Sequence, residues 1–280
     1  DKPGNATTAT QSTSSITFDE TVPTITAIAT SDFSWGESLN STEDDTDATV
    51  TVTTTGVEDG QTVTITLNGT VYTALTSSNS ATVTITAAGL QGLIDDQTYS
   101  LTADVKDVAT NEAVTVISTT FTVDKTLPTI AITATNGTSN VADGSSSTSV
   151  LTVTFTASEA TTTFAVGDIT VSNGTLSNFN ASSSTVYTAT FTHTSTGATT
   201  IDVASNSFTD AAGNNNTAAD QFNWTYIIPT VTLSSNATTI AENGTATITA
   251  TLNASHAGET IINFTPSGTA ILDGDYLVTY

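Results

Sequence analysis

The stretch "TVTITLNGTVYTALT" (residues 62–76) decides the fold class. On both sides of Asn68-Gly69, apolar residues alternate with threonine, which is the period of a strand with one buried face. Asn-Gly favours a two-residue hairpin turn, because both residues adopt positive φ at low cost. The stretch therefore predicts an antiparallel hairpin. Its threonines suit the outward face, since β-branched side chains pack well on a pleated surface.

The same alternation continues through the rest of the chain. Seven short strands in about 100 residues are typical of an immunoglobulin-like sandwich, so the sequence predicts an all-β fold of tandem Ig-like sandwiches with Greek-key connections, arranged in an extended rod. Tyr99 is placed either as a tyrosine-corner residue or as a half-buried strand aromatic. Besides the hairpin, strands are expected at 24–30, 48–55, 81–87, 98–105, 113–123, 149–158, 168–179, 185–194 and 199–208, with one helical turn within 87–96.

A junction segment recurs three times, at 1–25, 107–130 and 210–231. Each copy has an Asp-initiated turn ending in Asn, then an alternating strand, then a proline. The prolines, Pro23, Pro128 and Pro229, are 105 and 101 residues apart, which fits a tandem of whole domains better than a solenoid. The predicted organisation is the final strand of a preceding repeat at 1–20, Ig-like domains at 21–127 and 128–229, and a partial third domain at 230–280.

Composition narrows the function classes. The net charge is −24, with three lysines and no arginine, which argues against nucleic acid as a partner because nucleic-acid binding depends on Lys and Arg. Such a charge favours bound or diffuse divalent cations that offset self-repulsion. There is no cysteine, so disulfides cannot stabilise the fold. No run of about 18 apolar residues predicts membrane insertion of this segment. We expect an extracellular, β-rich piece of a longer chain.

Two groups of motifs resemble known families. The segments "GQTVTITLNGTVYTA", "GLQGLIDDQTYSLTADVKDVATNEA" and "FTVDKTLPTI" resemble bacterial Ig-like extender repeats of giant surface adhesins and biofilm proteins. The second repeat, with "SFTDAAGNNNTA", looks like a sister bacterial Ig-like family. Residues 240–276 resemble the start of a Calx-beta domain. These resemblances imply a secreted or cell-surface location, an adhesive or matrix role, and calcium that stiffens the linkers between domains.

Calcium is the cofactor that the junctions favour, because it takes six to eight oxygen ligands from carboxylates, amides and carbonyls. Asp and Asn are also ordinary turn residues, and this alternative stays open for each of them. Four residues before Pro229 the sequence has Thr225, so we expect that junction to be metal-free or differently built. The candidate metal ligands are Asp19 and Asp124 before the prolines, Asp104, Asp107 and Asn111 in and beside the second turn, and Asp210 in the third. The Calx-beta resemblance adds Glu242 and Asp275.

No grouping of residues predicts catalysis, so we expect no enzyme and no catalytic residues. His193 and His256 lack a neighbouring Cys, an HExxH motif or a nucleophile-elbow pattern, and both are expected at the surface. The acidic run "EDDTD" (43–47) is interpreted as a solvated loop. Trp35 with Phe33 is the one aromatic cluster that could bind carbohydrate, although core or linker packing is favoured.

The favoured function is therefore mechanical: an extender segment of a secreted or cell-surface bacterial adhesin or matrix protein, stiffened by calcium at its linkers. Its partners would be neighbouring repeats of the same longer chain. One alternative is a subunit of a polymerising extracellular fibre, sheath or surface layer, in which other copies of the chain supply missing strands. A second alternative is an ancillary module of a secreted carbohydrate-active enzyme.

Overall fold

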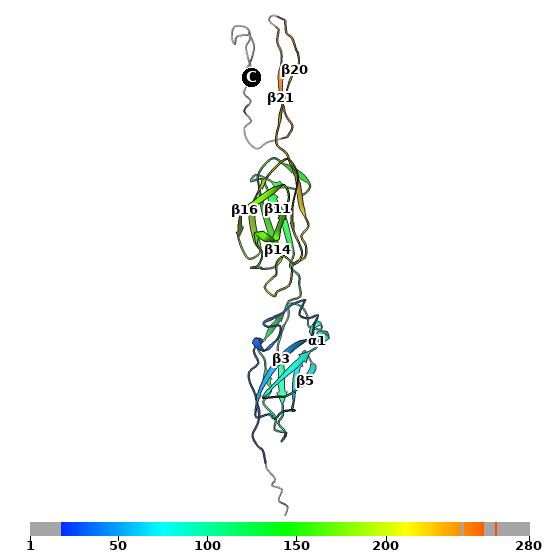
Figure 1. Cartoon of the computed structure of the whole chain (residues 1–280), viewed down its shortest axis with the longest axis vertical. Coiled ribbons are helices and arrows are strands. Elements are labelled where there is room, and N and C mark those ends of the chain that lie inside the picture. Colours follow the sequence, from blue (N-terminus) through cyan, green and yellow to red (C-terminus); the bar gives the residue numbers. More distant parts are fainter. Residues whose placement is uncertain (1–17, 242–243, 255–260, 262–280) are drawn as a thin grey trace, which may run out of the picture. The chain divides into compact units, whose positions relative to one another are not determined.

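The computed structural model describes residues 18–241, 244–254 and 261, and the chain forms two compact units (Figure 1). Unit 1 comprises the chain up to Pro128 together with the segment Phe208–Asn216. Unit 2 comprises Thr129–Ser207 and the chain from Thr217 onward. The segment Phe208–Asn216 lies inside the predicted domain 128–229, yet it packs in unit 1 because Asn40 and Ser41 hydrogen-bond to it.

Unit 1 is a sandwich of two β layers. One layer has the strand order β1-β3-β6; the other has the order β5-β4-β8-β9 and is prolonged by a ladder of order β2-β10-β7. The elements are β1 (Thr24–Ile25), η1 (Thr30–Asp32), β2 (Ser38–Leu39), β3 (Ala48–Thr55), β4 (Thr62–Leu67), β5 (Thr70–Leu75), β6 (Ser80–Ile85), α1 (Ala87–Gln91), β7 (Thr98–Tyr99), β8 (Leu101–Val105), β9 (Val116–Ile117) and β10 (Phe121–Val123).

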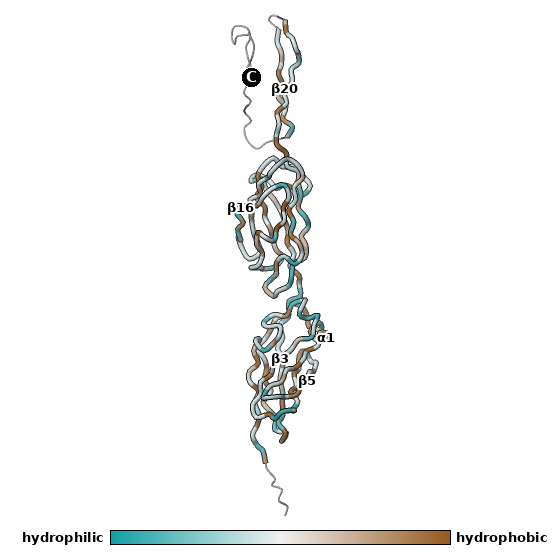
Figure 2. The backbone as a smooth tube through the Cα atoms, in the orientation of Figure 1, coloured by the Kyte–Doolittle hydropathy of each residue, from teal (hydrophilic) through white to brown (hydrophobic). Residues whose placement is uncertain are grey.

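The hairpin predicted from residues 62–76 is confirmed. β4 and β5 pair antiparallel from Thr62↔Leu75 to Leu67↔Thr70, and the turn residues Asn68 and Gly69 have φ values of 47° and 79°. Along β4 the apolar side chains are buried and the threonines alternate with them, as the period of two requires. Figure 2 shows hydrophobic and hydrophilic residues succeeding one another along the strands.

Unit 2 repeats the architecture. A sheet of order β12-β11-β14-β17-β16 faces a sheet of order β13-β19-β18-β15, and β20 pairs with β21 in a separate hairpin. The elements are β11 (Ile130–Thr135), β12 (Asn140–Val141), β13 (Ser145–Ser147), β14 (Leu151–Ala157), η2 (Val166–Asp168), β15 (Ile169–Val171), β16 (Gly174–Ala181), β17 (Val186–His193), β18 (Gly197–Val203), β19 (Phe222–Tyr226), β20 (Val231–Ser235) and β21 (Ile248–Leu252).

Two short parallel pairs close the sandwiches. In unit 1, β2 runs parallel to β10, and in unit 2, β13 runs parallel to β19. Together with the antiparallel pairs, this gives each unit the two-layer arrangement of an Ig-like fold. The predicted all-β fold of tandem Ig-like sandwiches is thus confirmed.

The aromatic residues of unit 1 fill its core. Phe33 and Trp35 are each 5% exposed, and their rings stack with centroids 4.9 Å apart. Phe121 meets both rings edge-on. Core packing of Trp35 is therefore confirmed, and these buried rings offer no exposed platform for a sugar.

The structure refines two local predictions, the strand at 24–30 and the position of Tyr99. The strand predicted at 24–30 ends at Ile25, because the chain turns into η1, where Asp32 accepts a hydrogen bond from the Ala29 N–H (2.8 Å). Tyr99 is half-buried, and its hydroxyl oxygen accepts a hydrogen bond from the Ile94 N–H (3.0 Å). That contact to backbone a few residues upstream is the hallmark of a tyrosine corner.

Candidate functional site

Two groups of Asp and Asn side chains in unit 1 are built alike. The first joint motif is Asp19 with Asp107 and Asn111, and the second joint motif is Asp124 with Asp210 and Asn214. In each, one Asp stands four residues before a proline, while the loop from the other Asp to the Asn folds back on itself. The structure thus brings together most of the metal ligands that the sequence predicts.

Asn214 organises the second joint motif and is completely buried. Its backbone N–H donates to Asp210 Oδ1 (2.9 Å), and its side-chain Nδ2 donates to Asp210 Oδ2 (3.0 Å) and to the carbonyl oxygen of Asp124 (2.9 Å). Its Oδ1 accepts from the Ser41 N–H (2.8 Å). One amide therefore holds the segment Phe208–Asn216 on the end of the unit 1 sandwich.

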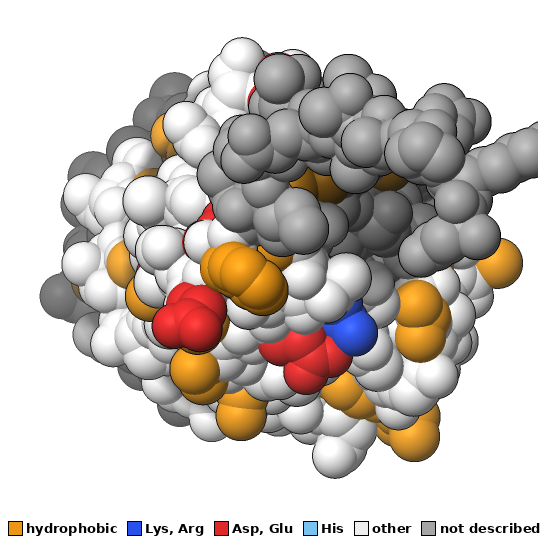
Figure 3. All heavy atoms as spheres, turned by 90° about the horizontal axis from the view of Figure 1, so that it is seen from below, with side chains coloured by type: hydrophobic (Ala, Val, Ile, Leu, Met, Phe, Trp, Pro, Cys, Tyr) orange, Lys and Arg blue, Asp and Glu red, His pale blue; other side chains and the backbone are white. Residues whose placement is uncertain are grey.

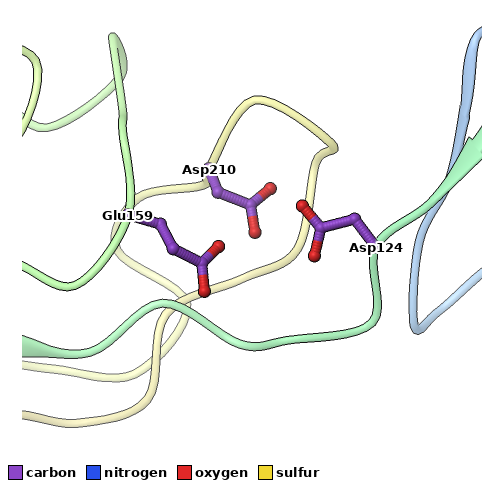
Figure 4. A group of neighbouring side chains, drawn as sticks. All are labelled: Asp124, Glu159 and Asp210. Carbon is purple, nitrogen blue, oxygen red and sulfur yellow. The ribbon is translucent and has the colours of Figure 1, made fainter. Parts of the chain in front are cut away.

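The carboxylates of Asp124 and Asp210 face one another (Figure 4), with ligand oxygens within 4.8 Å. Glu159, labelled in the same view, belongs to unit 2. Asp210 is buried and Asp124 is half-buried. Burial, and after it the negative charge of Asp210, raises the pKa of Asp124 above its ordinary value. Keeping both carboxylates ionised therefore costs free energy in the folded state.

The first joint motif repeats this geometry, but two of its three residues are more exposed to solvent. Asn111 donates from its N–H to Asp107 Oδ1 (2.8 Å) and from Nδ2 to Asp107 Oδ2 (2.8 Å). The same Nδ2 also donates to the carbonyl oxygen of Asp19 (3.0 Å), as Asn214 does to Asp124. Asp107 is buried, whereas Asn111 is half-buried and Asp19 is exposed.

Lys125 distinguishes the second joint from the first, which has Glu20 at the matching position. Its ammonium lies 2.8 Å from Asp44 Oδ2, and the two side chains are 19% and 9% exposed. The ammonium also donates to three backbone carbonyl oxygens where α1 ends, at Leu90, Gln91 and Leu93 (3.3, 3.2 and 3.0 Å). A positive charge is favourable there, because the carbonyls of a helix C-terminus carry partial negative charge.

Asp95 fastens the backbone beside this lysine. Its Oδ1 accepts from the Lys125 N–H (2.6 Å) and its Oδ2 from the Thr126 hydroxyl (2.9 Å). The hydrogen bond from the Lys125 N–H is the main reason why the pKa of Asp95 lies below its ordinary value. The segment that follows β10 is therefore held to unit 1 through both its side chain and its backbone.

The acidic run 43–47 is only in part the solvated loop that the sequence predicts, because Asp45 and Asp47 are exposed whereas Asp44 is buried. Asp44 is 6% exposed and pairs with Lys125. Glu43 accepts from the Asn40 N–H, Asp45 accepts from Gln91 Nε2, and Asp47 accepts from the Ala87 N–H at the start of α1. The run carries specific bonds to α1 and the linker, which its sequence could not reveal because the partners lie about 40 to 80 residues away.

The other predicted ligands lie apart from the two joint motifs. Asp104, on β8, is half-buried and accepts a hydrogen bond from the Thr115 hydroxyl. Glu242 and Asp275 lie outside the described residues. Figure 3, a view of one face, shows a few separate red and blue groups among uncharged side chains. On this face, the charged side chains lie in a few small groups.

The joint motifs suit calcium in the type of atom they offer. Both present carboxylate and carbonyl oxygens, the donors that this hard cation prefers. At the second joint a divalent cation would offset both the burial and the repulsion from Asp210 that raise the pKa of Asp124. Asp124 and Asp210 are the residues that would hold it there, and Asp19 and Asp107 are their counterparts at the first joint.

His193 is not the surface residue that the sequence predicts. It is half-buried and accepts a hydrogen bond from Trp224 Nε1 to its Nε2 (2.8 Å). No sequence pattern indicates this contact, because His193 and Trp224 lie on different strands, 31 residues apart. His256 lies outside the described residues. None of the described helices has the length and apolar character that a membrane crossing needs.

Comparison with known proteins finds one family match within the chain. Residues 124–226 match the family model described as bacterial Ig-like domain. No curated protein matches the chain. These comparisons give no support for the Calx-beta-like segment at 240–276, which stays a prediction.

Several solved structures are similar to the chain. A bacterial ice-binding adhesin is 20% identical and covers 78% of this chain and 70% of its own, with a TM-score of 0.47. A calcium-stabilised adhesin from an Antarctic bacterium is 21% identical over 76% of this chain and 51% of its own, with a TM-score of 0.42. A bacterial Ig-like domain from the M. primoryensis ice-binding adhesin is 26% identical over 37% of this chain and 96% of its own (TM-score 0.27).

Proposed function

We propose that the chain is an extender segment of a secreted or cell-surface bacterial adhesin or matrix protein. In this role, Ig-like sandwiches in series hold an adhesive or matrix-forming region away from the cell. The observation that carries the proposal is the repetition of one joint motif, in which Asn111 and Asn214 bind the carbonyls of Asp19 and Asp124. A device that precedes successive prolines about one domain length apart along the chain is suited to a serial mechanical role.

The bonds of the second joint support a mechanical role for the linker. Residues 124–126 are bound through the Asp124 carbonyl, the Lys125 ammonium and N–H, and the Thr126 hydroxyl. Together these bonds join the linker to three parts of unit 1, namely the segment Phe208–Asn216, the loop before β3, and Asp95 in the turn after α1, which accepts two of them. A force along the linker would therefore be shared by several hydrogen bonds.

Calcium is the second part of the proposal. Bound between Asp124 and Asp210, it would neutralise two carboxylates that repel one another and would tie the linker to the segment Phe208–Asn216. Asp19 and Asp107 would do the same at the first joint. The ion supplies charge neutralisation and oxygen coordination, and the chain's amides and backbone N–H groups keep the carboxylates oriented.

Calorimetric titration of the full chain with calcium tests this part. We expect binding, and a higher Tm in calcium than in a chelator, because a ligand at 100 times its Kd stabilises the folded state by about 2.7 kcal/mol. D124N and D210N should each remove calcium binding at the second joint, where both residues lie. D104N is the matched control, since Asp104 belongs to neither joint motif and bonds to Thr115; it should bind calcium as the parent chain does.

Small-angle scattering of the same samples tests the mechanical role. An extended monomer whose flexibility falls in calcium supports the whole proposal. If calcium neither binds nor changes Tm while the particle is extended, the calcium part is wrong and the extender part stands. A particle that is compact in both conditions contradicts the extender role itself.

A polymerising subunit is the second candidate, and one observation favours it. The β20–β21 hairpin has an apolar face, with Leu233 52% and Ile248 57% exposed, and Val231 paired with Leu252 on the same side. A two-stranded hairpin is marginally stable alone, so a strand from another copy of the chain would complete it. Sedimentation should then show concentration-dependent association that L233E abolishes, and a monomer at every concentration would rule this function out.

A further inference from the structure

His193 connects the two sheets of unit 2. It lies at the end of β17 in the five-stranded sheet, and its partner Trp224 lies in β19 of the four-stranded sheet. The indole Nε1 of Trp224 donates to His193 Nε2 at 2.8 Å. Trp224 is 2% exposed, so water cannot replace the acceptor that His193 provides.

Aromatic rings hold the imidazole in place. The ring of Tyr226 stacks on it, with centroids 3.8 Å apart and an interplanar angle of 8°. Phe191 meets it edge-on at 5.0 Å and also packs against the indole of Trp224 at 4.9 Å. The imidazole is thus confined to the orientation in which Nε2 faces the indole N–H.

We propose that His193 and Trp224 form an acid-sensitive clasp between the two sheets of unit 2. The contact requires neutral imidazole with its proton on Nδ1, because Nε2 must accept. Protonation puts an N–H on Nε2 that points at the N–H of Trp224, and neither group can accept from the other. The clasp then opens, and the buried indole N–H is left without a partner, which is costly.

The charged surroundings do not oppose this behaviour. Tyr226 is the titratable group that stacks on His193, and β16 on the other side contains no Asp, Glu, Lys or Arg. On the facing sheet, Asp202 of β18 binds Gln221, and Asp143 binds the Asn223 N–H. Burial of His193 lowers its pKa below the ordinary value. The direction of this shift follows from burial, and no nearby carboxylate is invoked to explain it.

The sign of the effect follows from that direction. A histidine whose pKa is lower in the folded state binds fewer protons there than in the unfolded chain. Its stabilising contribution is complete above the unfolded pKa of about 6.5 and is lost as the pH falls from there through the folded pKa. Over this pH range, the folding equilibrium constant of unit 2 should fall about tenfold for each unit by which the folded pKa of His193 lies below its unfolded pKa.

The full chain can report the clasp through its two tryptophans, Trp35 and Trp224. In ¹H–¹⁵N spectra each gives one indole N–H signal, and W224F assigns them. An H256Q background leaves His193 as the single imidazole. On titration from about pH 8 to about pH 5, we expect the Trp224 signal to shift with the midpoint of His193, below 6.5, while the Trp35 signal keeps its position.

Two variants separate the clasp from general acid sensitivity. H193Q keeps an uncharged acceptor, so it should fold at pH 8 and show a Trp224 signal that does not titrate. H193F removes the acceptor and should lower the stability of unit 2 at every pH. The proposal is overturned if His193 titrates while the Trp224 signal stays fixed, or if H193Q loses stability with acid as the parent does. If H193Q does not fold, the titration of the parent chain alone decides.

Discussion

At the first joint the Asn111 amide binds the carbonyl of Asp19, and at the second joint the Asn214 amide binds the carbonyl of Asp124, yet the two amides have different surroundings. Asn214 is completely buried and also accepts from the Ser41 N–H. Asn111 is half-buried. The same hydrogen bonds should therefore contribute more at the second joint, because water can replace them at the first.

The charged residues next to the joints differ as well. At the second joint Lys125 brings a positive charge to Asp44 and to the end of α1, while at the first joint the same position holds the exposed Glu20. A motif of aspartate and asparagine thus sets where the linker binds. The residue that follows the aspartate, together with the groups that surround it, decides how strongly the linker is held, and each position can be tested by substitution.

The largest effect is expected from N214A. The variant leaves the buried carboxylate of Asp210 and the half-buried Asp124 carbonyl and Ser41 N–H without their partner, and an unsatisfied buried group costs about 1–3 kcal/mol. We expect a loss of about 4 kcal/mol in the free energy of unfolding, measured by urea denaturation. N111A is the matched change at the half-buried amide and should cost about 1 kcal/mol. Equal losses would show that burial does not distinguish the joints.

The next effect is expected from K125M. This variant keeps the apolar stem of the side chain but removes the charge, so Asp44 is left as a buried carboxylate without its cation. Breaking a buried ion pair in this way costs about 3 kcal/mol.

K106M is the control for the loss of a lysine. Lys106 pairs with Glu112, but the two side chains are 59% and 68% exposed, and pairs of this kind contribute under about 1 kcal/mol. Thermal unfolding of both variants measures the contrast. A Tm for K125M as close to the parent as that of K106M would contradict the role assigned to Lys125.

A smaller effect is expected from the carboxylate pair in acid. The pKa of Asp124 is raised, so the folded state binds its proton more readily than the unfolded chain does. The repulsion from Asp210 is therefore present at neutral pH and is relieved as the pH falls through the raised pKa. In a chelator, the parent should gain stability relative to D124N on moving from about pH 7 to about pH 5. A constant difference between the two would show that Asp124 carries no such penalty.

The fold could be predicted from sequence because it depends on local alternation. Val63, Ile65 and Leu67 alternate with threonines, and Asn68-Gly69 sets the turn, so the hairpin is specified within 15 residues. The parallel strands β2 and β13 were missed. They contain two and three residues, too few to show a period, and only their distant partners define them.

The site was predicted in part for the same reason. Asp19 and Asp124 each stand four residues before a proline, and each turn has an Asn four residues after its Asp, so Asp19, Asp107, Asn111, Asp124 and Asp210 could be recognised. The roles of Lys125 and His193 could not, because each is defined by partners on other strands or loops. A lysine before a proline looks the same in sequence whether its ammonium is in water or bound to a helix terminus.

The smallest effect is expected from E20K, which gives the first joint the residue of the second. If a lysine after the aspartate were sufficient to hold the linker, this variant would gain stability comparable to the loss in K125M. Glu20 is exposed, however, and the bonds of Lys125 come from Asp44 and from three carbonyls at the end of α1. We expect E20K to change the free energy of unfolding by about 0.5 kcal/mol or less, measured beside K125M in urea. A gain of several kcal/mol would mean that the charge alone, without the helix terminus, fastens the linker.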